Sequence, residues 1–189
     1  MKKIILAATA LLVSFATFAQ QTWKVDKSHA KVGFTVTHLL MSEVDGNFKT
    51  FDATITSSKE DLSDAVFEVS ADISSIDTDS EMRDNDLKSE KHFDAAKFPK
   101  FTFKSTSISK VADKKYKLTG DLTLKGVTKP VTFDLALTGT GMNGRTKKPK
   151  VGLKVTGTIK RTDFGVGSMP AAVVGEEVEL RAVGEFEQM

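Results

Sequence analysis

The residues that could do chemistry in this sequence are few and lie far apart. There are three histidines, His29, His38 and His92, and no cysteine, and the His-Glu-x-x-His spacing typical of zinc enzymes does not occur. The glycine-rich segment around Ser168 reads GVGSMP, which is not the Gly-x-Ser-x-Gly turn of a serine nucleophile. We therefore predict no catalytic residue, no metal site and no cofactor, and leave open a catalytic site assembled from scattered residues.

Two other motifs match known patterns only in part. Residues 139–144, GTGMNG, have the spacing of a dinucleotide-binding loop, but that loop must lead from a strand into a helix, and here strand patterns lie on both sides. The segment that begins at Asp77 resembles a calcium loop, although Met82 takes the place of the required glycine and Lys88 that of the bidentate glutamate. We interpret the first as a hairpin tip with a type I′ turn and the second as a helix with an acidic first turn.

The elements that must position any site are mostly strands, because apolar and polar residues alternate along most of the chain. The alternating segments are residues 31–38, 46–56, 65–73, 101–105, 116–124, 131–137, 151–161 and 178–186. A change of parity between Phe48 and Phe51 suggests a bulge. The alternation breaks for one helix near residues 79–90, where Thr78 and Glu81 have capping-box spacing.

Eight amphipathic strands with hairpin connections predict an all-β fold, an eight-stranded antiparallel barrel with one helical excursion between its third and fourth strands. A closed barrel is favoured over a sandwich because closure hides every strand edge. No linker, internal repeat or low-complexity segment divides the chain. We expect one domain over residues 20–189.

The first nineteen residues have the pattern of a secretory signal peptide. Lys2 and Lys3 precede an apolar run over residues 4–18, and the run is too short for a retained membrane span. We expect residues 1–19 to be removed and the mature protein to be periplasmic or secreted. Without cysteine it forms no disulfide. The charge is balanced, with 27 Lys and Arg against 25 Asp and Glu, so no nucleic-acid partner is expected.

Two polar residues lie on apolar strand faces. His38 continues the alternation of residues 31–38, and Arg161 continues that of residues 151–161. A buried cation needs a partner. One interpretation is a structural ion pair or a strand end that has reached water; the other is a group that meets a ligand's polar head at the barrel mouth. We expect both residues near one opening of the barrel, within reach of a head group or of an acidic residue such as Asp84.

Several blocks of the sequence, in order, closely resemble the YceI-like polyisoprenoid-binding family. They are DKSHAKVGFTVTHLLMSEVDGNFKTFDATI, SSIDTDSEMRDNDLKSEKHFDAAKFPKFTFKST, LTGDLTLKGVTKPVTFDL and GTIKRTDFGVG. The resemblance runs from about Trp23 to the C-terminus. It implies a lipocalin-like eight-stranded barrel with a helix near one end and a long isoprenoid in an apolar tunnel. The chain departs from the family pattern at Lys27, Asp86 and His92.

The barrel and the resemblance together predict a lipid carrier. An eight-stranded barrel is either just filled by side chains or able to hold one small ligand, and small inward residues such as Gly120 and Gly157 are expected to leave room. We therefore predict an exported binding protein for a long-chain isoprenoid-type lipid, polyprenyl or isoprenoid-quinone-like. The residues expected to line the tunnel are Phe34, Val36, Phe48, Phe51, Phe67, Val69, Phe101, Phe103, Leu122, Leu124, Phe133, Leu135 and Val155.

Several alternatives stay open at this point. The chain could be an enzyme that acts on such a lipid, or a stress-induced structural protein whose barrel is filled. Two further partners are also open, a membrane surface contacted transiently and a second copy of the chain in a homodimer.

Overall fold

The computed structural model describes residues 20–59 and 61–189, so the predicted signal peptide lies outside the described residues. The strands are β1 (Gln21–His38), β2 (Ser42–Phe48), β3 (Phe51–Ser57), β4 (Val66–Asp72), β5 (Ile76–Asp77), β6 (Lys100–Ala112), β7 (Lys115–Leu124), β8 (Val127–Met142), β9 (Pro149–Lys160) and β10 (Val174–Gln188). The helices are α1 (Glu81–Lys88) and the 3-10 helices η1 (Ile73–Ser75) and η2 (Arg161–Phe164). No helix among the described residues is long and apolar enough to cross a membrane.

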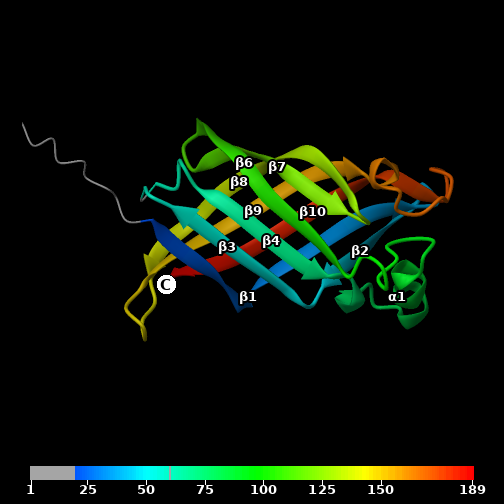
Figure 1. Ribbon diagram of the computed structural model, residues 1–189, viewed down its shortest axis with the longest axis horizontal. Coiled ribbons are helices and arrows are strands. Elements are labelled where there is room, and N and C mark those ends of the chain that lie inside the picture. Colours follow the sequence, from blue (N-terminus) through cyan, green and yellow to red (C-terminus); the bar gives the residue numbers. More distant parts are fainter. Residues whose placement is uncertain (1–19, 60) are drawn as a thin grey trace, which may run out of the picture.

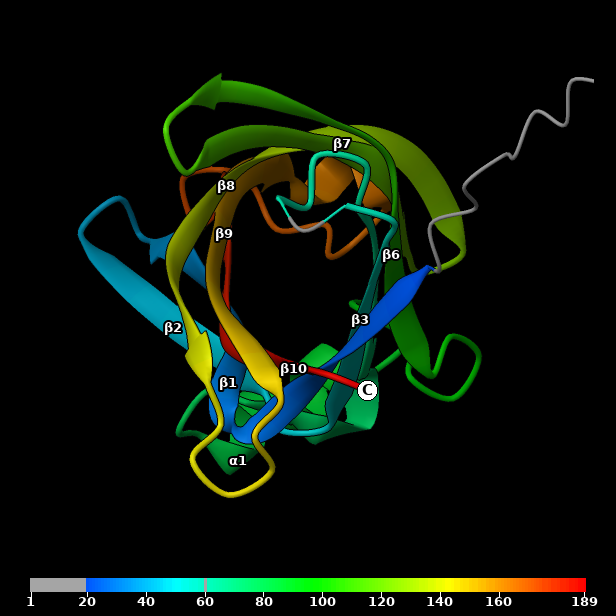
Figure 2. The same ribbon diagram turned by 90° about the vertical axis from the view of Figure 1, so that its left-hand side faces the viewer.

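Eight of the strands form a closed antiparallel barrel (Figures 1 and 2). Their order is β10-β9-β8-β7-β6-β4-β3-β1, and β1 pairs in turn with β10. The first residues of β1 pair with β3 and its last residues with β2, while β5 pairs with β2. Because β2 and β3 act as one interrupted strand, and β4 and β5 as another, the predicted eight-stranded barrel with one helix is confirmed.

The strand interruption replaces a predicted bulge. Between Phe48 and Phe51 the chain leaves the ladder for two residues, and Lys49 and Thr50 bond instead to the η1 segment. Lys49 N–H donates to the Ser75 carbonyl at 3.1 Å, and the Thr50 carbonyl accepts from Asp72 N–H at 2.9 Å. Both phenylalanines stay buried.

Strand alternation places side chains largely as expected. Leu122, Leu124, Phe133 and Leu135 are buried, whereas Lys117 and Asp121 are exposed. Lys125 differs, because its side chain is half-buried and its Nζ donates to the carbonyls of Glu90 at 2.9 Å and Gly165 at 3.1 Å.

Two local predictions are wrong. The N-cap of α1 is Ser80 without a side-chain cap bond, and Thr78 donates through its N–H and Oγ1 to Asp84 Oδ1, at 2.9 and 2.6 Å. Thr78 therefore orders the helix start through Asp84 rather than through a capping box with Glu81. The β8–β9 hairpin has no type I′ turn at Asn143, because positive φ occurs at Lys147 instead.

Gly120 in β7 is held in close contact with the neighbouring strand. It pairs with Ser105, next to a register shift in β6, and a Cβ at Gly120 would lie 2.4 Å from the Lys104 carbonyl oxygen and 2.6 Å from the Phe103 ring. Ser105 Oγ accepts a hydrogen bond from Phe67 N–H at 2.8 Å. The irregular pairing at this point therefore depends on the absence of a side chain.

We predict that Gly120→Ala lowers the free energy of unfolding by about 1–3 kcal/mol, because backbone atoms must move to admit the methyl group. Urea denaturation followed by circular dichroism measures the change. Gly139→Ala is the matched control in β8, since among the described residues no heavy atom beyond its chain neighbours lies within 4 Å of its Cβ position. Equal stability of the two variants would contradict the proposed contact.

Candidate functional site

The barrel encloses an apolar cavity of about 360 Å³. All of the residues predicted for the tunnel line this cavity except Leu135. Leu135 is buried beyond it, paired with Tyr116 in β7. The volume lies within the range of small-molecule sites.

The cavity is closed at one end and accessible at the other. Trp23, Ile55, Leu62 and Tyr116 are buried and do not border the cavity. Trp23 pairs with Ile55 and with Gln188, so this group packs the barrel end at which the chain ends in Figure 1. Around α1 and in the η2–β10 loop, by contrast, exposed residues line the cavity. We call the mouth the rim formed by the exposed residues His38, Arg83, Asp86 and Met169 and the half-buried His92.

The small inward residues have two different effects. Among the small residues on the inward faces, Ala53, Ala182 and Gly184 line the cavity, whereas Ala71 is buried and does not border it. The rings of Phe103 and Phe133 instead cover Gly120 and Gly157, 2.6 and 2.4 Å from where their Cβ atoms would lie. The expectation that these two glycines leave room is wrong, because aromatic rings fill the space above them.

Arg161 is buried, with 7% of its surface exposed, and lines the cavity. Its Nε donates to the Gly175 carbonyl in β10, and its two terminal nitrogens donate to four more carbonyls, three in the η2–β10 loop and one at the first residue of β10. These acceptors belong to Val166, Gly167, Met169 and Val174, at 2.6–3.1 Å.

A guanidinium has five N–H donors, and at Arg161 all of them bind backbone carbonyls. Arg161 therefore has no ion pair with Asp84, which bonds to Thr78 instead. The expectation that Arg161 reaches an acidic residue is wrong, and it has no donor left for a head group. Its position in the fold indicates that it holds the loop that borders the mouth.

The polar groups that remain at the mouth come mainly from the α1 segment. His92 Nε2 lies 3.1 Å from Asp86 Oδ2, and Arg83 donates through Nε to Thr78 Oγ1 at 2.8 Å. His38 is exposed at the end of β1 and lines the same cavity, so its role toward a head group stays a prediction. From the sequence, Asp86 and His92 bear on the polar end of a ligand only as departures from the family pattern, and Arg83 is given no such role. Arg83 and Asp86 are three residues apart and so share a helix face.

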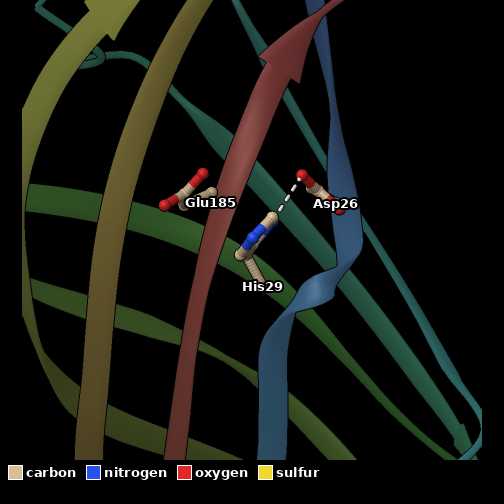
Figure 3. A group of neighbouring side chains, drawn as sticks. All are labelled: Asp26, His29 and Glu185. Atoms are coloured by element: carbon tan, nitrogen blue, oxygen red, sulfur yellow. Dashed lines mark hydrogen bonds and ion pairs between the residues drawn. The ribbon is translucent and has the colours of Figure 1, made fainter. Parts of the chain in front are cut away.

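A separate polar cluster lies on the barrel wall, where β1 bulges away from β10 (Figure 3). His29 Nδ1 is 2.9 Å from Asp26 Oδ2, and Glu185 lies beside them. Lys150 Nζ bonds to Asp26 Oδ2 at 3.2 Å and to Glu185 Oε2 at 2.5 Å. Although the three ligand types could bind a metal ion, the Lys150 ammonium already supplies the positive charge between the two carboxylates.

The same cluster does not have the geometry of a catalytic triad. Ser28 Oγ and Asp26 both approach Nδ1 of His29, at 3.1 and 2.9 Å, whereas a relay needs one partner on each ring nitrogen. Hydrogen bonds from Ser28, then His29, and then Lys150 hold the pKa of Asp26 well below its usual range. Bonding to Glu185 and Asp26 raises the pKa of Lys150. These contacts favour a structural role for the cluster.

We predict that Asp26→Asn lowers the free energy of unfolding at pH 7 and that the deficit narrows as the pH falls below about 4. A carboxyl whose folded pKa is lowered stabilises the protein above its unfolded pKa, near 4, and this contribution is lost as pH falls toward the folded pKa. Urea denaturation of both proteins from pH 7 to pH 2 measures the difference. A deficit that stays constant over this range would contradict the assignment.

We predict that Arg161→Lys lowers the free energy of unfolding by roughly 2–4 kcal/mol, because an ammonium cannot reach five carbonyls spread around a planar fork. Arg145→Lys, at an exposed position in the β8–β9 hairpin, is the control and should be neutral. Unchanged stability of Arg161→Lys, together with loss of a bound ligand, would assign Arg161 to ligand contact instead.

Comparisons with known proteins agree with this architecture. The model of the YceI-like domain family matches residues 23–186 of this chain.

Individual relatives have the same extent. Protein YceI of Salmonella newport (strain SL254) is 38% identical over 184 residues, 95% of each chain. The crystal structure of a Campylobacter jejuni YCEI protein is 32% identical with a TM-score of 0.71, covering 87% of this chain and 96% of that one. A polyisoprenoid binding domain from Saccharophagus degradans has the same fold at 13% identity, with a TM-score of 0.65 over 88% of this chain and 98% of that one. The chain belongs to the YceI-like family.

Proposed function

We propose that this protein is an exported carrier that binds one long-chain isoprenoid-type lipid, polyprenyl or isoprenoid-quinone-like, inside the barrel. The observation that carries the proposal is the enclosed cavity of about 360 Å³ with its almost wholly apolar lining. A cavity of this kind argues against a structural barrel with a filled core. The lipid class is supported by family membership and by the related fold of the Saccharophagus degradans domain, which is described as polyisoprenoid-binding.

The lining suits a branched, unsaturated hydrocarbon chain. Phe48 packs against Phe34, Phe93 and Phe101, with ring centroids 5.0–6.4 Å apart, and Phe103 packs against Phe133 at 5.3 Å. Each methylene that moves from water into such a lining contributes about 0.8 kcal/mol. A lipid chain can therefore be bound without any polar contact.

The polar end of the lipid would lie at the mouth. Because the donors of Arg161 are fully used, the groups available there are those of His38, Arg83, Asp86 and His92. This mixed rim can bond to a hydroxyl, to a quinone carbonyl or, through Arg83, to an anionic head. Head-group selection would therefore be loose.

Export and localisation belong to the same proposal. The basic residues and apolar run over residues 2–18 support removal of a signal peptide and a periplasmic or secreted mature protein. An apolar ligand has very low solubility in water, so a carrier in an aqueous compartment has a clear physical use.

The test is mass spectrometry of lipids extracted from natively purified protein and from protein loaded with a prenyl-chain lipid. A prenyl lipid recovered unchanged supports the carrier. A chemically altered lipid would favour an enzyme that acts on it, and absence of lipid from both samples would contradict the proposal.

We predict that Val155→Trp reduces the amount of retained lipid at least several-fold, because a large ring on this cavity-lining residue occupies the lumen. Thr158→Trp is the matched control on β9, since Thr158 is exposed and should retain lipid at the level of the unmodified protein. A cooperative thermal melt checks that both variants fold, and Val69→Phe replaces Val155→Trp if it does not fold. Full retention by a folded lumen variant would contradict binding inside the barrel.

A further inference from the structure

The β1–β2 hairpin presents large apolar side chains to solvent at its turn. Leu39, Leu40 and Met41 are 44%, 73% and 81% exposed. We call residues 39–41 the tip. Figure 1 shows that this end of β2 lies at the same end of the barrel as α1, away from the C-terminus.

The backbone of the tip is unfavourable for the residues it contains. Leu39 and Leu40 have φ of 52° and 55°, the left-handed region that suits Asn and Gly and is costly for bulky side chains. The β7–β8 turn also has positive φ at two consecutive residues, and these are Lys125 and Gly126. Two leucines at such a turn do not help the fold, which points to a role outside the folded chain.

The tip joins an uncharged loop that borders the mouth. Leu39 N–H donates to the Val173 carbonyl at 2.9 Å, and residues 164–175, like residues 39–42, contain no charged residue, whereas 28% of the whole chain is charged. Met169 of this loop is 51% exposed and also lines the cavity. The exposed apolar surface is therefore continuous with the apolar cavity.

We infer that the tip and this loop dock into the surface of a lipid bilayer, so that a lipid moves between bilayer and cavity without crossing water. The inference rests on the proposed function. The cavity indicates which partner docks there. Because the apolar surface is continuous with a cavity proposed to bind lipid, the partner that suits this surface is a lipid bilayer. A protein bound there would cover the mouth.

Charge around the tip indicates the kind of bilayer. Glu43 and Asp45 follow the tip on β2, and Glu176 and Glu177 follow the loop on β10, all four exposed. Glu177 lies opposite Lys160 of β9, and the other three carboxylates would be repelled by an anionic surface. Docking therefore depends on apolar insertion into a zwitterionic bilayer rather than on attraction between opposite charges.

The test measures extraction of a polyprenyl lipid from phosphatidylcholine vesicles by the mature chain, with Leu39→Asn/Leu40→Gly as the variant. Asn-Gly is the preferred pair for this turn, so the variant should melt at the same temperature as the unmodified protein or higher. We expect its extraction rate to fall at least roughly tenfold, since apolar insertion is lost. Its equilibrium binding of the same lipid from detergent micelles should not change.

The matched control is Val111→Asn/Met142→Asn. These residues are 57% and 63% exposed, close to the β6–β7 and β8–β9 turns at the opposite end of the barrel (Figure 1). The control should extract lipid at the original rate. Met41→Asn, which does not alter the two strained residues, replaces the tip variant if that variant does not fold.

The outcomes separate the two proposals. If the unmodified protein binds no prenyl lipid from micelles, the carrier function fails. If it binds lipid but the tip variant extracts as fast as the unmodified protein, the docking inference alone fails. A tip variant that turns a dimer into a monomer in analytical ultracentrifugation, with unchanged extraction, would show an interface between copies and overturn docking. Extraction that requires anionic lipid would also overturn it.

Discussion

The pairing of β1 with β10 is the contact on which the rest of the structure depends. It runs from Trp23 opposite Gln188 to His38 opposite Val174, and so joins the first and last strands of the described chain. Closure gives the first and last strands of the barrel a partner on each side and lets backbone hydrogen bonds hold the wall as a ring. In a sandwich, contact between inner side chains holds the two sheets together, so an interior void would remove the contact itself. A closed barrel can keep an open lumen because its wall does not depend on the lumen being filled.

The two ends of the barrel are stabilised in different ways. At the closed end, buried side chains such as Trp23, Ile55 and Leu62 form an ordinary packed core. At the mouth, long cationic side chains bind backbone carbonyls: Arg161 orders the η2–β10 loop, and Lys125 connects that loop to the α1 segment. Irregular backbone near an apolar cavity leaves many carbonyls without strand partners, and each needs a donor. Two cations meet this need without adding apolar bulk that would block the mouth.

Strand alternation was enough to predict the barrel and most of the cavity lining, because the period of two fixes which face a side chain takes. It does not fix the level of a residue along the barrel axis, so it cannot show that Leu135 lies beyond the cavity. Residues 26–29 do not alternate, yet β1 passes through them as a bulge and begins at Gln21.

Contacts between residues distant in sequence could not be predicted from the pattern. The partners of Arg161 are carbonyls, which every residue has, so no sequence signal marks them. Glu185 meets Asp26 only because β1 and β10 pair. The rings over Gly120 and Gly157 likewise come from neighbouring strands, and small size alone does not show whether a position is empty or covered.

The chemistry of the lumen limits how selective the protein can be. An apolar lining distinguishes ligands weakly, since one methylene more or less changes the binding free energy by only about 1–3 kcal/mol. Direct contacts at the mouth add little to this discrimination. The donors of Arg161 are used by backbone carbonyls, and the exposed groups of Arg83 and Asp86 are screened by water. Selection among apolar molecules then depends largely on which of them the mouth meets. For a barrel of this kind, the surface around the opening therefore decides which apolar molecules reach the cavity.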